Sequence, residues 1–209
     1  MKKTLIKFSV CLFLFFILAL PSEAAPLGQQ VLFYVDSSFD SLSRSSLTAT
    51  LQKESDKAYF YAENAWWDSL SSTQRVNAQT AITNLADEFD ERIYPQLTGA
   101  FGSIWNPGID GDPKVTILIS RLRDGAAGYF NSADEYPRSL APSSNQREMI
   151  YLGANYLSIP RAKGFLAHEF QHLITFYQKE KLRAVSEDIW LNEARSEYVS
   201  TLLGYDNVL

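Results

Sequence analysis

The stretch AHEFQHLI, residues 167–174, contains both histidines of the 209-residue chain, His168 and His172, with Glu169 beside the first. Apolar residues recur around it with helical spacing, and Pro160 suits a first helical turn, so we predict a helix from about residue 160 to residue 178. Four helical residues turn through about 400°, so the two imidazoles point the same way, about 6 Å apart along the axis. Such a pair can bind one metal ion.

A zinc ion held by two protein side chains lacks the third protein ligand that catalytic zinc sites contain. The segment WLNEARSEY, residues 190–198, supplies Glu193 and Glu197, one turn apart. They lie on a second predicted helix, with Ser186 as N-cap and its end at Gly204. We interpret Glu193 as the third ligand and Glu197 as the acceptor for a free histidine N–H. Four residues predict that this helix is at least half buried: Trp190, Tyr198, Val199 and Leu202.

Together, HEFQH at 168–172 and NEARSE at 192–197 resemble the gluzincin clan of zinc metallopeptidases. Thermolysin-like members of that clan pair HExxH with a downstream NExxSD or NExxSE. The resemblance implies peptide-bond hydrolysis by a metal-activated water, with a glutamate as general base. It also implies a set of site residues: His168, His172 and Glu193 as zinc ligands, Glu169 as the base, and Asn192 and Glu197 behind the two histidines.

Four longer segments look like the secreted bacterial neutral zinc peptidases of hyicolysin type: GIDGDPKVTILI, GYFNSADEY, SNQREMIYL and WLNEARSEY. The likeness spans roughly residues 100 to 205, and the two zinc motifs are its specific part. A metzincin would need HExxHxxGxxH, but Thr175 stands in place of the glycine and Gln178 in place of the third histidine. Residues 185–205 contain no aspartate motif of comparable strength, as an aspzincin would. The resemblance therefore implies a zinc metalloendopeptidase.

The rest of the sequence predicts an α+β fold with strands first and the helix pair last. Runs of strand type occur at 29–35, 57–66, 115–120 and 147–153, whereas 45–55 is ambiguous. Apolar residues spaced for one helical face lie between 72 and 97, where Pro95 kinks or ends the helix. We therefore expect an N-terminal mixed β-sheet with a packed helix, followed by the HExxH helix and the second zinc-ligand helix. The tripeptide GYF at 128–130 is a candidate edge strand for pairing with an extended substrate.

The N-terminus has the pattern of a secretory signal peptide: three lysines, an apolar run from Phe8 to Leu20, and small residues near Ala24. That run reaches about 20 Å as a helix, short of the roughly 30 Å hydrocarbon core. We expect cleavage after Ala24, a catalytic domain over residues 25–209, and a secreted or otherwise extracytoplasmic protein without stable membrane insertion. Cys11 is the only cysteine and would leave with the signal, so no disulfide is expected.

The net charge of the chain limits which kinds of binding partner we expect. The formal net charge of −5 at pH 7 argues against nucleic acid and against anionic membrane surfaces, because both reward clustered Lys and Arg. We expect protein or peptide substrates instead. Asp110 and Asp112, on a glycine-containing loop, are the beginning of a calcium site, although the remaining ligands of the standard calcium loop are missing.

The sequence also departs from the thermolysin-like pattern. Those enzymes carry a helical domain after the second zinc helix, with a cationic or imidazole group that steadies the oxyanion. Here the sequence stops five residues after Gly204 and has no third histidine. We expect that domain to be absent or truncated, and Arg195 or a tyrosine to replace the group. Two alternatives stay open: a zinc-bound non-catalytic binding or surface module, and an aminopeptidase, for which a GxMEN-like segment is missing.

Overall fold

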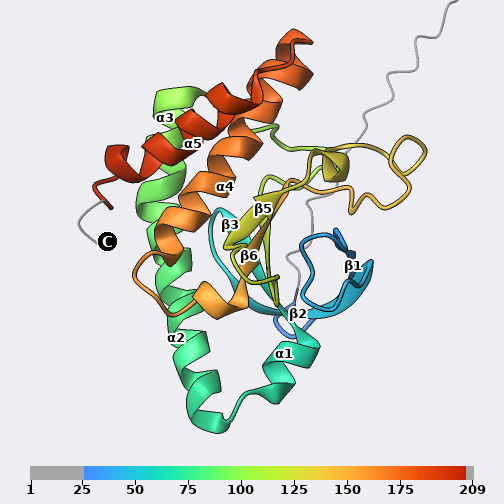
Figure 1. Ribbon diagram of the computed structural model, residues 1–209, viewed down its shortest axis with the longest axis vertical. Coiled ribbons are helices and arrows are strands. Elements are labelled where there is room, and N and C mark those ends of the chain that lie inside the picture. Colours follow the sequence, from blue (N-terminus) through green and yellow to red (C-terminus); the bar gives the residue numbers. More distant parts are fainter. Residues whose placement is uncertain (1–25, 206–209) are drawn as a thin grey trace, which may run out of the picture.

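In the computed structural model, residues 26–205 are described, and they form one six-stranded mixed sheet with helices on one side (Figure 1). The strands are β1 (Gln30–Tyr34), β2 (Ser46–Glu54), β3 (Ala58–Glu63), β4 (Val115–Ser120), β5 (Gly128–Phe130) and β6 (Met149–Gly153). Their order is β1-β2-β3-β4-β6-β5. β2 pairs antiparallel with both β1 and β3; β3, β4 and β6 are parallel, and β5 pairs antiparallel with β6 at the edge. The predicted α+β class is confirmed.

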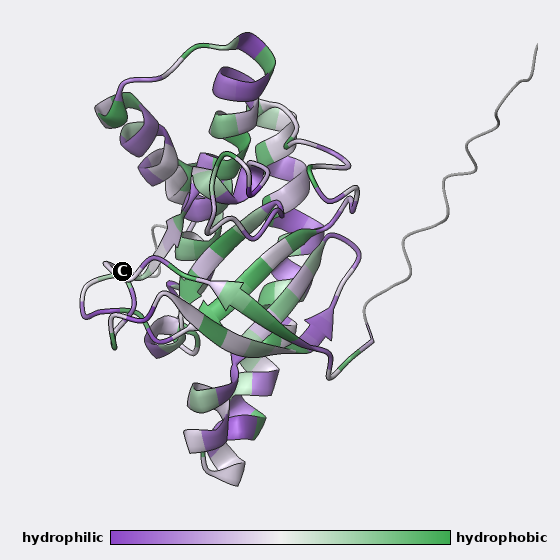
Figure 2. Cartoon of the chain, turned by 90° about the vertical axis from the view of Figure 1, so that its right-hand side faces the viewer, coloured by the Kyte–Doolittle hydropathy of each residue, from purple (hydrophilic) through white to green (hydrophobic). Residues whose placement is uncertain are grey.

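The three parallel strands are buried on both faces, which explains their continuous apolar sequences. Residues such as Phe60, Ile117 and Ile150 pack on the helical side, whereas Tyr61 and Tyr151 belong to a second apolar cluster on the other side, with side chains from β1 and β2. Figure 2 shows apolar residues running along these strands. The sheet is therefore the rigid platform on which the helices rest.

The helices are α1 (Asn64–Ser69), α2 (Ser72–Glu88), α3 (Tyr94–Phe101), α4 (Ala162–Phe176) and α5 (Ile189–Leu202). The helix predicted over 72–97 is interrupted by a π-helical turn, Phe89–Ile93, and resumes as α3. Pro95 lies in the first turn of α3, directly after this π-helical turn. The strand predicted over 57–66 ends at Glu63, and α1 follows. The ambiguous segment is β2, with Leu47, Ala49 and Leu51 buried in alternation.

The predicted helix pair is present, with corrected boundaries. α4 packs against β5, β6 and α5 and continues into a π-helical turn, Tyr177–Lys181. α5 starts at Ile189 with Asp188 in the N-cap position, so Ser186 as N-cap was wrong. The expectation that α5 is at least half buried was also wrong: Trp190 is 68% exposed and Tyr198 55% exposed. Apolar residues on a helix do not reveal from sequence whether another element covers them.

Within residues 26–205, no helix combines the length and the apolarity needed to cross a bilayer. The predicted signal peptide, residues 1–24, lies outside the described part of the chain, so cleavage after Ala24 stays a prediction.

Candidate metal centre

The two histidines of α4 meet at their Nε2 atoms. His168 and His172 lie one turn apart on α4, and their Nε2 atoms are 3.1 Å from each other. The helix is fixed by its neighbours, since Leu166, Phe170 and Leu173 are buried in the core on the helical side of the sheet. Core packing therefore sets the direction in which both imidazoles point.

Glu193 of α5 completes a group of three. Its Oε2 lies 3.5 Å from His168 Nε2 and its Oε1 lies 3.6 Å from His172 Nε2. One ligand atom from each residue can be chosen so that all three lie within 4.8 Å of one another. Two ligands about 2.1 Å from a tetrahedral zinc ion lie about 3.4 Å apart, so these separations fit zinc. Two histidines and one glutamate also form a donor set of catalytic zinc sites, which leave a position free for water.

The outward-facing ring nitrogens also have partners. Glu197 Oε1 lies 3.7 Å from His168 Nδ1. Behind His172, however, Ser196 Oγ lies 3.2 Å from Nδ1 and is fully buried. In the tautomer whose Nε2 is free for a metal, Nδ1–H donates to this hydroxyl, which fixes the ring. Asn192, predicted for that place, lies beside His172 but its buried Oδ1 has no hydrogen-bond partner.

Ser196 was not singled out by sequence reasoning. The only available signal was its place in NEARSE, three residues after Glu193 and therefore on the same face of α5. Burial, and then the charge of His168, lower the pKa of His172 from its ordinary value. A neutral imidazole keeps the lone pair that a metal needs.

Glu169 lies next to the histidines and is almost fully buried, with 8% exposed. Burial, and then the charges of Glu193 and Glu197, raise the pKa of its carboxyl group to about 8. Its position depends on Gly128 of β5: a Cβ there would lie 2.8 Å from Glu169 Cγ and 3.0 Å from Oε1. The absence of a side chain at residue 128 lets the strand approach this carboxylate.

Open cleft space lies on both sides of Glu169. One part, of about 520 Å³, is lined by Arg123, Gly128 and Phe165 together with His168 and Glu169. The other, of about 350 Å³, runs along β5 to His172, Asn192 and Glu193. Phe39 lines both parts and stacks on Tyr129, with 4.5 Å between ring centroids. The group of three ligands thus faces a groove whose floor is the edge strand β5.

Arg195 does not reach this groove. It forms an ion pair with Glu187 and donates to Thr175 Oγ1, beside a separate cavity that Gln171 and Lys179 also line. The expectation that Arg195 could steady an oxyanion was therefore wrong, because its guanidinium group is held on the other side of α4.

The two aspartates proposed for calcium cap their own loop. Asp110 Oδ1 accepts from Asp112 N, and Asp112 Oδ1 accepts from Lys114 N. Asp112 Oδ2 accepts from the hydroxyl of Tyr59. These hydrogen bonds give both carboxylates a local structural role.

Comparison with known proteins gives a partial match to a metalloprotease. No family model matches the chain. The neutral metalloprotease ShpI of Staphylococcus hyicus is 31% identical over 128 residues, which cover 53% of this chain. The match covers 28% of that relative, so the chain spans less than a third of its length. The similarity supports a metallopeptidase-type function and a metal cofactor.

Proposed function

We propose that this chain carries the active site of a zinc-dependent endopeptidase of the gluzincin clan that acts outside the cytoplasm. The observation that carries the proposal is the convergence of His168 Nε2, His172 Nε2 and a Glu193 oxygen within 4.8 Å. A buried glutamate beside that group adds the second element a hydrolase needs. The partial similarity to a neutral metalloprotease supports the same reaction class.

His168, His172 and Glu193 would hold the zinc ion. Bound zinc supplies Lewis-acid chemistry, polarising a peptide carbonyl and making water more acidic. Glu169 is the residue that moves the proton: it takes the proton from the attacking water and delivers it to the leaving amine. Burial raises the pKa of this carboxyl group when no metal is bound, and the positive charge of a bound zinc ion would lower it again, which would leave the carboxylate able to accept a proton.

Peptides are the substrates that the groove fits. β5 pairs with β6 on one side only and lines the groove with Gly128, Tyr129 and Phe130. An extended peptide would add a strand to this edge, with its scissile bond beside Glu169. The Asn192 amide lines the groove beside His172 and is a candidate to steady the developing oxyanion. We expect no nucleic-acid partner.

Export is proposed on the N-terminal sequence alone. The lysines, the apolar run and the small residues before residue 25 are those of a secretory signal. A protein released that way would meet protein substrates outside the cytoplasm.

The test is hydrolysis of unfolded casein by purified protein with zinc, with a chelator, and with zinc restored after chelation. We expect cleavage with zinc, none with the chelator, and recovery when zinc returns. Cleavage that persists under full chelation, with zinc absent by elemental analysis, would overturn the zinc mechanism.

A zinc-bound non-catalytic module is the second candidate. The exposure of α5 favours this second candidate. The side chains of Glu193 and Glu197 are 52% and 79% exposed, so α5 leaves the groove open on the side of these two glutamates. The same casein assay separates the candidates: stoichiometric zinc without any cleavage would favour the module.

A further inference from the structure

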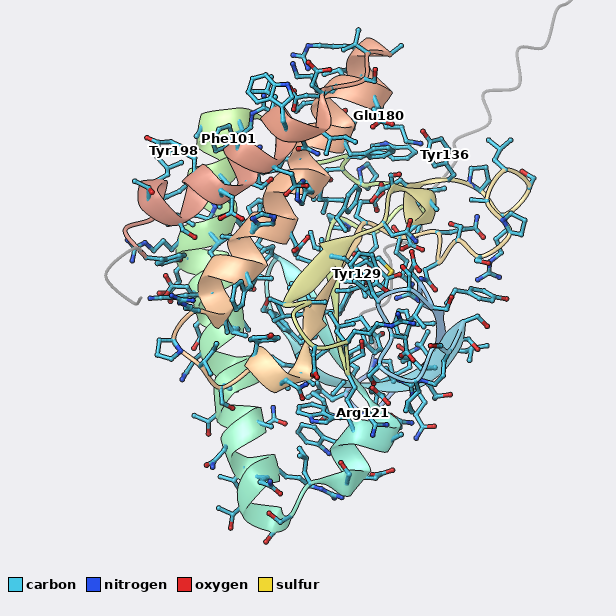
Figure 3. The ribbon with its side chains drawn as sticks, viewed as in Figure 1. Phe101, Arg121, Tyr129, Tyr136, Glu180 and Tyr198 are labelled. Carbon is cyan, nitrogen blue, oxygen red and sulfur yellow. The ribbon has the colours of Figure 1, made fainter. Side chains whose placement is uncertain are left out.

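A separate polar cavity of about 320 Å³ lies beside the C-terminal half of α4. It is lined by the end of α3, by α4 and the π-helical turn that follows it, and by α5. Figure 3 labels Phe101, which lines the cavity from α3, and Glu180 of the π-helical turn at the same end of the molecule. Three cations line the cavity, Lys179, Arg183 and Arg195, and none of its lining residues is a carboxylate.

The positive charge at this cavity exceeds the negative charge beside it. Glu187 accepts from Arg195 through both carboxylate oxygens, and its Oε1 lies 3.4 Å from Lys179 Nζ. Arg183 donates to the backbone and side-chain oxygens of Gln178, and in the described part of the chain it forms no ion pair. One carboxylate thus stands against three cations. An anion that carries two negative charges would balance the remainder.

A buried amide group beside the cations lacks one hydrogen-bond partner. Gln171 is fully buried and lines the cavity, and its Oε1 has no partner. Its Nε2 donates to Thr175 Oγ1 at 3.0 Å, and this oxygen also accepts from Arg195. If the amide turns by 180°, the Thr175 hydroxyl donates to Oε1 instead. The Nε2–H group is then the group without a partner, and an anion in the cavity would accept from it.

The wall that carries Arg183 is fixed by its packing. Gln178 Nε2 donates to the backbone oxygen of Ser103 at 2.7 Å, and Gln178 Oε1 accepts from Arg183 Nη1 at 3.1 Å. Gly102 has a φ of +101°, and a Cβ there would lie 2.6 Å from Gln178 Cδ, so the backbone closely approaches this side chain. Because Gln178 holds Arg183, less side-chain freedom is lost when an anion binds.

We propose that this cavity binds a phosphate group. Phosphate is a tetrahedral dianion, and its oxygens would accept from Lys179, Arg183 and the Gln171 amide, with further positive charge from Arg195. Guanidinium groups match phosphate oxygens in geometry, whereas a carboxylate would bring only one negative charge. The inference goes beyond the proposed peptidase function and does not depend on it, because no residue of the cavity is a metal ligand or lines the groove.

A bound phosphate group would connect α5 to the end of α4. Arg195 belongs to α5, whereas Lys179 lies in the π-helical turn that continues α4. Only Ser196 and Val199 of α5 are buried, so few contacts oppose its opening. An anion bound between the two elements would stabilise the closed arrangement by mass action.

The test titrates sodium phosphate into zinc-loaded protein at about pH 8, where phosphate is mainly a dianion, and measures the heat of binding. We expect one phosphate per chain with a Kd of about 1 mM or tighter. Sodium sulfate has the same shape and charge and should compete, whereas sodium acetate should bind at least about tenfold more weakly. O-phosphoserine distinguishes the two sources: tighter binding than inorganic phosphate would indicate a phosphoester, and weaker binding would indicate the free ion.

Two variants place the anion in the cavity. R183Q and K179Q each remove one positive charge at a partly exposed position, so the fold should be retained. Each should weaken phosphate binding by about tenfold or more without changing zinc content. Arg161→Gln removes the same charge at an exposed position beside the other end of α4 and should bind phosphate like the unaltered protein.

Two results would overturn the proposal. One is the absence of any saturable heat at phosphate concentrations up to about 10 mM. The other is undiminished phosphate binding in both R183Q and K179Q, which would place the anion elsewhere, for instance on the zinc ion.

Discussion

α4 and α5 contribute to the same candidate centre, yet α4 is built into the core while much of α5 faces solvent. On α4, eleven of fifteen residues are buried, and His172 is 9% exposed. On α5, the buried residues are Ser196 and Val199, and Glu193 is 52% exposed. Figure 3 labels Tyr198 on the outer side of α5. Packing therefore holds the histidines before any ion binds, whereas the glutamate depends more on the ion itself.

The largest expected effect is on the rate of peptide hydrolysis and comes from Glu169 of α4. Glu169→Gln removes the proton acceptor while keeping shape and burial, so peptide hydrolysis should fall by about 10²- to 10⁴-fold. Zinc content should stay at one per chain, because residue 169 is not a ligand. Initial rates on casein and elemental analysis measure both. Glu180→Gln, an exposed position on the π-helical turn, is the matched control; wild-type rates in E169Q would exclude Glu169 as the base.

The second prediction concerns Asp134, a buried residue of the 3-10 turn Ser132–Glu135. Burial raises the pKa of Asp134 to about 6, so the folded state holds a proton that the unfolded chain has lost. The free energy of unfolding should then fall as pH rises from about 4 to about 6, by roughly 3 kcal/mol from this group. Asp134→Asn should remove that part of the decline in urea unfolding with a chelator present. Asp124→Asn, in an exposed loop, should keep it; equal slopes in wild type and D134N would refute the assignment.

A smaller effect is expected where α5 supports His172. Ser196→Ala removes the partner of Nδ1, and loss of such a partner typically weakens metal binding by about 10- to 100-fold. Competition with a zinc-sensitive dye would measure the change. Ser200→Ala, one turn further along α5, is the control and should bind zinc like wild type. An unchanged zinc Kd in S196A would mean that ring packing alone orients His172.

The smallest expected effect concerns the difference in burial between α4 and α5. Removing zinc should speed hydrogen exchange in α5 by about tenfold or more, while most amides of α4 stay protected. The reason is the small buried surface of α5. Exchange followed by mass spectrometry, with and without chelator, compares the two helices in one sample. Equal changes in both helices would show that they open as one unit.

The sequence predicted well those elements whose pattern is local. The apolar runs at 115–120 and 147–153 became β4 and β6, because a strand buried on both faces has no need of polar residues. The pair His168 and His172 was predictable because helical geometry alone brings them together. Glu193 followed from the motif, and its distance from both imidazoles is below 4 Å.

What the sequence did not predict depends on contacts between distant segments. Trp190 and Tyr198 suggested burial, but no described element covers them in residues 26–205. Asp134 and Asn145 are eleven residues apart, in a connection without periodic pattern, and only the fold brings their side chains within 2.9 Å of each other. Ser196 gave no distinctive signal, because a serine in a helix is usually solvated or bonded locally.

The most direct test of the central claim is a crystal structure of zinc-loaded protein with anomalous diffraction recorded at the zinc edge. We predict one strong peak about 2.0–2.2 Å from His168 Nε2, His172 Nε2 and a Glu193 oxygen, with water completing the coordination. A zinc peak bound to other side chains, or Glu193 turned away from an ion held by the histidines alone, would contradict it.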